Sequence, residues 1–215
     1  MEEEKEEIHE NDEETVFPVE KLKEIEDDGA NNDAVPLNTA WTFWLDRSVK
    51  GANADEFEAS LVKIYTVETV QTFWSVFNHI KDVRQLKEKY TYHLMRGTRR
   101  PMWEDEQNCR GGNWRIKSHK RDTPRIWKEL LVAAIGEQLT EFINEGDEIG
   151  GLSVSPREYD DIIQIWNTRA DLHDKASIEN DVRRLLSGVQ IIAMFYKAFS
   201  THQAFSGTKS RKVSK

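Results

Sequence analysis

Short stretches of alternating apolar and polar residues run through the chain from about residue 35 onward. In WTFWLDR (41–47), the apolar residues Trp41, Phe43 and Leu45 alternate with Thr42, Trp44 and Asp46. This two-residue period predicts a β-strand with an aromatic side chain on each face. The same reasoning predicts six further strands, in SLVKIYTV, YTYHLMR, NWRIKS, GGLSVS, DIIQIWN and QIIAMFYKAF.

Three longer segments repeat their apolar residues at helical spacing instead. We expect the helix in TVQTFWSVFNHI (69–80) to take Thr69 as its N-cap. The helix in DTPRIWKELLVAAIGEQL (122–139) has Thr123 as its expected N-cap and Pro124 in the first helical position. A third helix, in ASIENDVRRLLSGV (176–189), is expected to end at Gly188. Because the elements follow no regular βαβ order, the pattern predicts the α+β class with an antiparallel sheet.

Charge divides the chain into parts. Residues 1–34 carry 15 acidic and 3 basic side chains, and the rest carries 24 acidic and 27 basic ones, so the net charge of −9 comes from the N-terminal segment. We expect an acidic disordered tail over residues 1–34, a folded domain over 35–205 and a mobile basic tail over 206–215. The folded part is mildly basic, which leaves a nucleic-acid ligand open.

The sequence lacks the features of secreted and membrane-spanning proteins. One cysteine, Cys109, excludes an internal disulfide and fits a reducing compartment. No apolar run reaches the roughly 18 residues of a membrane span, and the N-terminus has no secretory pattern. The expected location is therefore the cytoplasm, and a nuclear location is left open.

The segment RPMWEDEQ (100–107) places a large aromatic ring beside a carboxylate. An electron-rich indole such as that of Trp103 attracts a positively charged planar ring beyond ordinary stacking. The neighbouring carboxylate of Glu104 can accept two parallel hydrogen bonds from the N1–H and N2–H groups of guanine, which adenine does not offer. The pair thus fits 7-methylguanine, although a tryptophan beside a glutamate is most often a packing residue next to a solvated acid.

Several segments, in order, resemble the eukaryotic translation initiation factor 4E family of mRNA cap-binding proteins. They are WTFWLDR, TVQTFWSVFNHI, RPMWEDEQNCRGGNW, WKELLVAAIGEQ and IIQIWN, and they span roughly residues 35–200. WTFWLDRS, IYTVETVQTFWSV, YHLMRGTRRP and WKELL are similar to the type 3 branch. The resemblance implies a curved antiparallel sheet of about eight strands, three helices on its convex face and an mRNA-cap slot on its concave face.

The resemblance also implies roles for single residues of the slot. Trp103 corresponds to a stacking tryptophan, and Glu104 to the glutamate that reads guanine. Trp166, in IQIWN, corresponds to the tryptophan that touches the N7-methyl group, and Arg157, in SPREYD, to an arginine that contacts the triphosphate.

The chain departs from the family at three other positions. Phe57 stands where most members place the second stacking tryptophan, and its smaller face predicts a weaker sandwich. Two family phosphate-binding cations appear as Asn113 and Ile162, which leaves Arg157 with Lys209 or Lys212 of the C-terminal tail. We therefore expect weaker binding of the mRNA cap than is typical of the family.

A second surface is implied on the other side of the sheet. Trp74 and Val70 lie one turn apart on the predicted first helix and are expected to point outward. In the family, such a tryptophan grips a short helical peptide from a scaffold like initiation factor 4G or from a 4E-binding regulator. Lys128 stands where an apolar leucine is usual, and this charge should alter which partners bind. The residues expected on the surface are Pro36, Leu37, Val70, Trp74, Glu129 and Val132.

Two other functional classes were weighed against this interpretation. Glu104, Asp105 and Glu106 could indicate a glycosidase, but acids in one short loop do not flank a scissile bond. The six histidines show no recognisable pairing, so we expect no enzyme, no metal and no cofactor. A protein-interaction module that has lost binding of the mRNA cap stays open, because of the substitutions at 57, 113 and 162. In either case we expect a monomer without membrane attachment that acts in translation initiation or its regulation.

Overall fold

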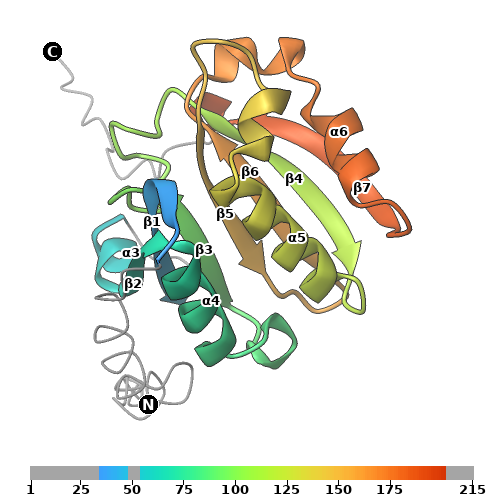
Figure 1. Cartoon of the computed structure of the whole chain (residues 1–215). Helices are drawn as coiled ribbons and strands as arrows, with labels where there is room; N and C mark the ends of the chain where they lie inside the picture. The colour runs from blue at the N-terminus through green and yellow to red at the C-terminus, as the bar shows by residue number, and fades with distance from the viewer. Residues whose placement is uncertain (1–33, 48–53, 202–215) are drawn as a thin grey trace, which may run out of the picture.

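One curved sheet of seven strands organises the part of the protein that the computed structural model describes, residues 34–47 and 54–201 (Figure 1). All of its pairings are antiparallel, in the order β2-β1-β3-β5-β6-β4-β7. The strands are β1 (Pro36–Arg47), β2 (Val62–Thr69), β3 (Tyr90–Arg96), β4 (Gly112–His119), β5 (Ile149–Ser155), β6 (Asp160–Asn167) and β7 (Ile191–Ala198). The predicted α+β class is confirmed, and the expectation of about eight strands is corrected to seven in the described residues.

Helices cover one face of this sheet, the convex one. The three predicted helices are α4 (Val70–His79), α5 (Thr123–Ile135) and α6 (Ile178–Leu185). A fourth, α3 (Ala54–Ala59), lies where the sequence pattern predicted no helix. No helix of the described part is long and apolar enough to cross a membrane. The predicted tails, together with Lys209 and Lys212, lie almost entirely outside the described residues.

The helix ends agree with the sequence pattern in one case and differ in another. Thr69 caps α4 as predicted, and its hydroxyl accepts a hydrogen bond from the backbone N–H of Thr72. Helix α5 begins one residue earlier than expected, with Asp122 as its N-cap. The prediction of Thr123 as N-cap was wrong because its hydroxyl instead lies 2.9 Å from that of Ser118 and donates to the carbonyl of His119.

The apolar core lies between the convex face and the helices. Trp41, Phe43 and Leu45 of β1 pack there with residues of α4 and α5, including Phe73 and Leu130. Since side chains alternate along a strand, the remaining β1 positions face the concave side, which we call the open face. The alternation in WTFWLDR thus separates a core face from a face that carries chemistry.

Strand register arranges the open face in rows that cross the sheet from β1 to β7. We call the first row, Thr42, Met95, Gly151, Trp166, Asn113 and Lys197, the upper row. The middle row, one residue pair further along each strand, consists of Trp44, His93, Ser153, Gln164, Arg115 and Phe195. Such an arrangement places side chains of neighbouring strands next to one another on the open face.

The loop from β3 to β4 crosses the sheet. Its last part, CRGGN (109–113), contains a tight turn in which Gly111 N–H donates to Asn108 C=O at 2.7 Å. Strands β3 and β4 are not neighbours, however, because β5 and β6 lie between them. A Cβ atom on Gly111 would lie 1.9 Å from the carbonyl oxygen of Asn167, so only glycine fits this close approach.

Candidate functional site

An aromatic cluster lies on the open face, separate from the main core. It consists of the buried residues Trp44, Met95, Trp166 and Phe199. The ring of Trp166 is 4.9 Å from that of Phe199, and only 6% of this tryptophan is exposed. Its indole N–H has no hydrogen-bond partner among the described residues, and the same holds for Trp44. The cluster is therefore an apolar, aromatic floor on the open face, the kind of lining that ligand sites typically have.

Trp103 packs against this floor from the loop that follows β3. It is half-buried, and the neighbouring Glu104 is exposed. Partial burial of the carboxyl group nevertheless raises the pKa of Glu104. The loop thus offers an aromatic face and a partly desolvated carboxylate side by side, the two groups that a 7-methylguanine ring requires.

A buried amide holds this loop in shape. Asn108 is 3% exposed, and its Nδ2 donates to the carbonyl oxygens of Arg100 and Met102 at 2.9 and 2.7 Å. These bonds fix the chain immediately before Trp103. The only local signal for Asn108 is its residue type, since an amide in an acidic turn is a common loop-forming residue.

Arg100 joins the two sides of the expected slot. Its guanidinium forms an ion pair with Asp105 at 3.0 Å in the Trp103 loop, and a second one with Glu58 of α3. Phe57 therefore lies on a short helix that is tied to the Trp103 loop. It is half-buried, but the residue of this segment that packs on the aromatic cluster is Leu61, one turn later. The stacking role of Phe57 stays a prediction.

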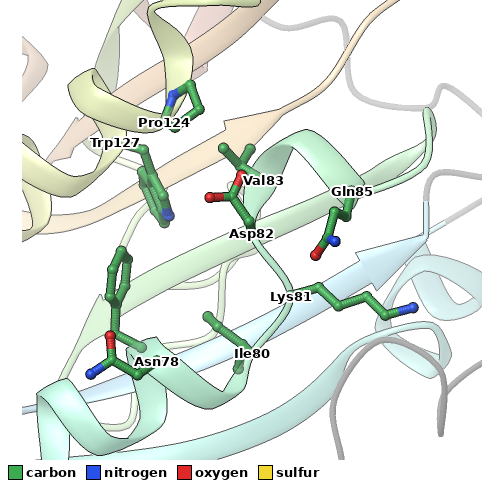
Figure 2. Close-up of a pocket in the computed structure, with 9 residues that line it drawn as sticks. Asn78, Ile80, Lys81, Asp82, Val83, Gln85, Pro124 and Trp127 are labelled. Atoms are coloured by element: carbon green, nitrogen blue, oxygen red, sulfur yellow. The ribbon is translucent and has the colours of Figure 1, made fainter.

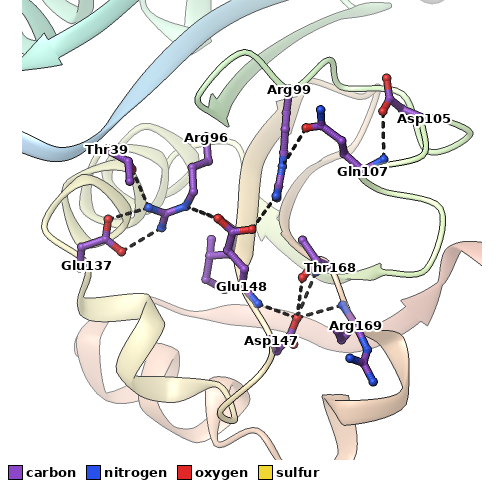
Figure 3. A network of polar contacts seen from close by, with 11 residues as sticks. Thr39, Arg96, Arg99, Asp105, Gln107, Glu137, Asp147, Glu148, Thr168 and Arg169 are labelled. Atoms are coloured by element: carbon purple, nitrogen blue, oxygen red, sulfur yellow. Dashed lines mark hydrogen bonds and ion pairs between the residues drawn. The ribbon is translucent and has the colours of Figure 1, made fainter.

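A network of arginines and acids anchors the same loop from the other side (Figure 3). Arg99 contacts Gln107 at 3.3 Å and Glu148 at 2.5 Å. Glu148 also lies 3.4 Å from Arg96. Arg96 in turn forms a bidentate ion pair with Glu137, with N–O distances of 2.7 and 2.9 Å. The loop is thus tied to the end of β3, the start of β5 and the end of α5.

The expected phosphate positions differ in exposure. Arg157 is exposed in the turn between β5 and β6, and its backbone N–H donates to Asp161. Asn113 is buried on β4, where its amide donates to Gln164. Ile162 is half-buried and carries no charge. Of the three positions, only Arg157 provides a cation.

A buried chain of hydrogen bonds that no sequence signal predicted lies on the open face and includes His93 and Ser153 of the middle row. His93 is placed between Asp46 and Ser153, with Nε2 2.6 Å from Asp46 Oδ2 and Nδ1 2.7 Å from Ser153 Oγ. The ring of His93 also meets the edge of Trp166 at 6.4 Å. Although this order of residues resembles a catalytic triad, Ser153 is 0% exposed, so no substrate reaches its hydroxyl. These hydrogen bonds hold His93 in place against Trp166 and so support the floor of the site.

The expected partner surface lies on the convex side, where α4 meets α5. Trp74 is half-buried and packs edge to face on Phe73 and Phe77, at 5.2 and 5.7 Å. The Lys128 ammonium of α5 lies 5.3 Å from the Trp74 ring. Of the other expected residues, Pro36, Glu129 and Val132 are exposed, and Leu37 and Val70 are half-buried. This is a mixed apolar and charged surface that spans two helices.

A pocket of about 340 Å³ continues this surface beyond Phe77 (Figure 2). It opens between the end of α4, the short segment that follows it and the start of α5. The residues that line it are Phe77, Asn78, Ile80, Lys81, Asp82, Val83, Gln85, Pro124 and Trp127. Because Phe77 contacts both Trp74 and the pocket, the two features form one surface.

Comparison with known proteins agrees with this geometry. The family model described as eukaryotic initiation factor 4E matches residues 36–214. Eukaryotic translation initiation factor 4E-4 of Caenorhabditis elegans is 32% identical over 166 residues, covering 77% of this chain and 75% of that protein. Eukaryotic translation initiation factor NCBP of Arabidopsis thaliana is 31% identical over 163 residues, covering 75% of this chain and 72% of that protein.

Two solved structures share the fold. One is C. elegans eIF4E-3 in complex with the 4E-binding protein Mextli and a cap analog, with a TM-score of 0.68 and 30% identity over 78% of this chain and 94% of that one. The other is Ascaris suum eIF4E-3 with the m2,2,7G cap, with a TM-score of 0.66 and 29% identity over 83% of this chain and 97% of that one. The chain therefore belongs to the eukaryotic initiation factor 4E family.

Proposed function

We propose that this protein binds the 7-methylguanosine cap of mRNA on the open face and a helical peptide of a translation scaffold or regulator on the α4–α5 surface. One observation carries the proposal. Trp103 presents its ring above a floor of buried aromatic residues, with the partly desolvated carboxylate of Glu104 beside it. Cap complexes of relatives with the same fold support this ligand class.

Fluorescence quenching with 7-methylguanosine triphosphate (m7GTP) and with GTP tests the mRNA-cap site. Only the methylated base carries the positive ring that an indole face attracts. We expect saturable quenching by m7GTP and at least tenfold weaker binding of GTP. Equal affinity for the two nucleotides would contradict the proposal.

Binding of m7GTP should also depend on pH. Burial raises the pKa of Glu104, and only the ionised carboxylate accepts both hydrogen bonds from guanine. As the pH falls through this raised pKa, the carboxylate becomes protonated and affinity should decline at a higher pH than an ordinary glutamate would allow. The measurement is the m7GTP dissociation constant between pH 4 and 8, with Glu104→Gln as the variant that should remove the dependence.

Partner binding should depend on Trp74 and not on Trp103. A large aromatic anchor at the centre of a helix-binding surface typically contributes at least 2 kcal/mol, or about thirtyfold in affinity. We expect Trp74→Ala to lose binding of a peptide from the 4E-binding protein Mextli, measured by calorimetry, while m7GTP still binds. Since Trp74 also packs on Phe73, Val132→Asp on the exposed side of α5 serves as a second variant. Normal peptide binding by both variants would place the partner elsewhere.

A second candidate function is a partner-binding protein of the same fold without binding of the mRNA cap. The observation that favours it is the loss of cations at Asn113 and Ile162, together with a half-buried Phe57 that lies outside the aromatic cluster. The m7GTP titration decides between the two, because this candidate predicts peptide binding with no quenching. For either function we propose a monomer that acts in the cytoplasm. Membership of the type 3 branch stays a prediction.

A further inference from the structure

Phe195 is an exposed aromatic side chain on the open face of the edge strand β7. It is 48% exposed and lies opposite Arg115 in the pairing of β7 with β4. Its neighbours Met194 and Tyr196 point to the other side and pack on the core. Two residues further, Lys197 lies on the same face as Phe195, opposite Asn113. The edge of the open face therefore carries one exposed aromatic ring between basic side chains.

A chain of hydrogen bonds holds Arg115 in this surface. Gln164 Oε1 accepts from Asn113 Nδ2 at 2.8 Å, and Asn113 Oδ1 accepts from Arg115 Nε at 3.0 Å. Asn113 therefore orients the cation on the next open-face position of its own strand. Where the family carries a phosphate-binding cation at position 113, this chain has Asn113. Arg115, at the next open-face position of the same strand, provides a cation instead.

The surroundings of Arg115 favour an anion. Burial, and in second place the positive charge of Arg157, lower the pKa of Arg115. Among the residues that the structure describes, no carboxylate forms an ion pair with Arg157. Two guanidinium groups that repel one another bind a phosphate group favourably, because it neutralises both and offers several acceptor oxygens.

The distance from the slot fits a short phosphate chain. Trp166 of the aromatic floor pairs with Asn113, and Asn113 pairs with Lys197. Phe195 is thus two strand spacings from Trp166, about 10 Å, and one row away. When the 7-methylguanine base stacks on Trp103, the phosphate chain attached to it extends across β4 past Arg115. The next nucleotide then lies at β7.

The chemistry of this edge matches single-stranded nucleic acid. Proteins that hold single strands combine basic groups along the backbone with an aromatic ring on which a base stacks. A helical peptide would need a wider apolar groove, and the other open-face position of β7 before Phe195 is only Ala193. RNA is therefore the occupant that these side chains favour.

We propose that the open face of β4 and β7 binds the nucleotide that follows the mRNA cap: Arg115 contacts the phosphate chain and Phe195 stacks on the first transcribed base. This inference rests on the mRNA-cap site proposed above. It adds a second base-binding position, so that the protein distinguishes a capped transcript from an isolated cap nucleotide.

Two titrations test the role of Phe195. The dinucleotide m7GpppA and m7GTP are each bound to the wild type, to Phe195→Ser and to Ile192→Ser, which alters a residue of the same strand that is 39% exposed. We expect the wild type and Ile192→Ser to bind the dinucleotide at least about fivefold more tightly than m7GTP, the lower end for one base stack. In Phe195→Ser the ratio should fall to about one. A wild-type ratio of one, or an unchanged ratio in Phe195→Ser, would overturn the assignment of Phe195.

The role of Arg115 is tested with ligands that differ in phosphate. We expect Arg115→Gln to lower the preference for m7GTP over the 7-methylguanosine nucleoside by about tenfold, the loss of one charge-assisted contact. Arg121→Gln removes an exposed cation after β4 and should keep the preference. If Arg115→Gln keeps it too, the phosphate assignment fails. The mRNA-cap site itself is tested by the wild-type comparison of m7GTP with GTP, which does not involve Phe195 or Arg115 variants. Failure of that site can therefore be distinguished from failure of the roles assigned to Phe195 and Arg115.

Discussion

Replacing Glu104 with alanine is expected to abolish retention on m7GTP resin. The carboxylate is the acceptor beside Trp103 that can take both the N1–H and the N2–H of guanine. Each such charge-assisted bond contributes about 1.5–3 kcal/mol, so the loss of two weakens binding by roughly two orders of magnitude or more. Trp103→Ala should have a similar effect through the lost cation–π stack.

The control lies in the same loop. Glu106 is exposed two residues beyond Glu104, and Glu106→Ala removes the same charge from the same region. If overall charge determines binding, the two variants should lose equal affinity, whereas the proposed geometry predicts that Glu106→Ala binds like the wild type. Retention of Glu104→Ala at the wild-type level would show that another group reads the base. Melting temperatures should stay close to that of the wild type, because Glu104 is exposed and gives up a partly desolvated charge.

His93→Ala is expected to cause the largest loss of stability among the variants considered. The substitution leaves the carboxylate of Asp46, which is 3% exposed, without its partner at 2.6 Å. The other oxygen of this carboxylate already lacks a partner in the described structure. Leaving a buried polar group without its hydrogen-bond partner typically costs about 1–3 kcal/mol, and more where the group is charged. Urea unfolding should therefore show a lower midpoint with an unchanged slope.

A double variant separates the lost pair from the lost packing. In Asp46→Ala/His93→Ala neither side chain is left buried without the other, so the combined loss should be smaller than the sum of the two single losses. His119→Ala provides the surface comparison, because His119 is about half exposed and lies 3.5 Å from Asp160. Additive losses at 46 and 93 would mean that the two side chains act independently. Binding of m7GTP by His93→Ala, measured below its unfolding range, should also weaken, since His93 supports Trp166.

Several features followed from local sequence alone. Two-residue alternation predicted the seven strands found in the described residues, and 3.6-residue spacing predicted α4, α5 and α6. Each period indicates which side of an element faces the core. The pairing of Trp103 with Glu104 was also readable, since adjacent residues in a short loop stay close whatever the fold. Local signals failed for α3 and for the N-cap of α5, where Ser118 from a preceding strand competes for the hydroxyl of Thr123.

Only the tertiary structure decided what surrounds that pair. Trp44, Trp166 and Phe199 are far apart in the chain. Antiparallel pairing through β3 and β5 brings Trp44 of β1 and Trp166 of β6 to the same face of the sheet, and Phe199 joins them from the short 3-10 helix that follows β7. The same pairing buries His93 between Asp46 and Ser153, and sets Phe195 opposite Arg115. Periodicity states which face a residue occupies but not which strand lies next to it, because strand order depends on long-range pairing and packing. The sequence therefore determined the strands, three of the helices and the proposed ligand class, whereas the residues that surround the Trp103–Glu104 pair depended on the order of the sheet.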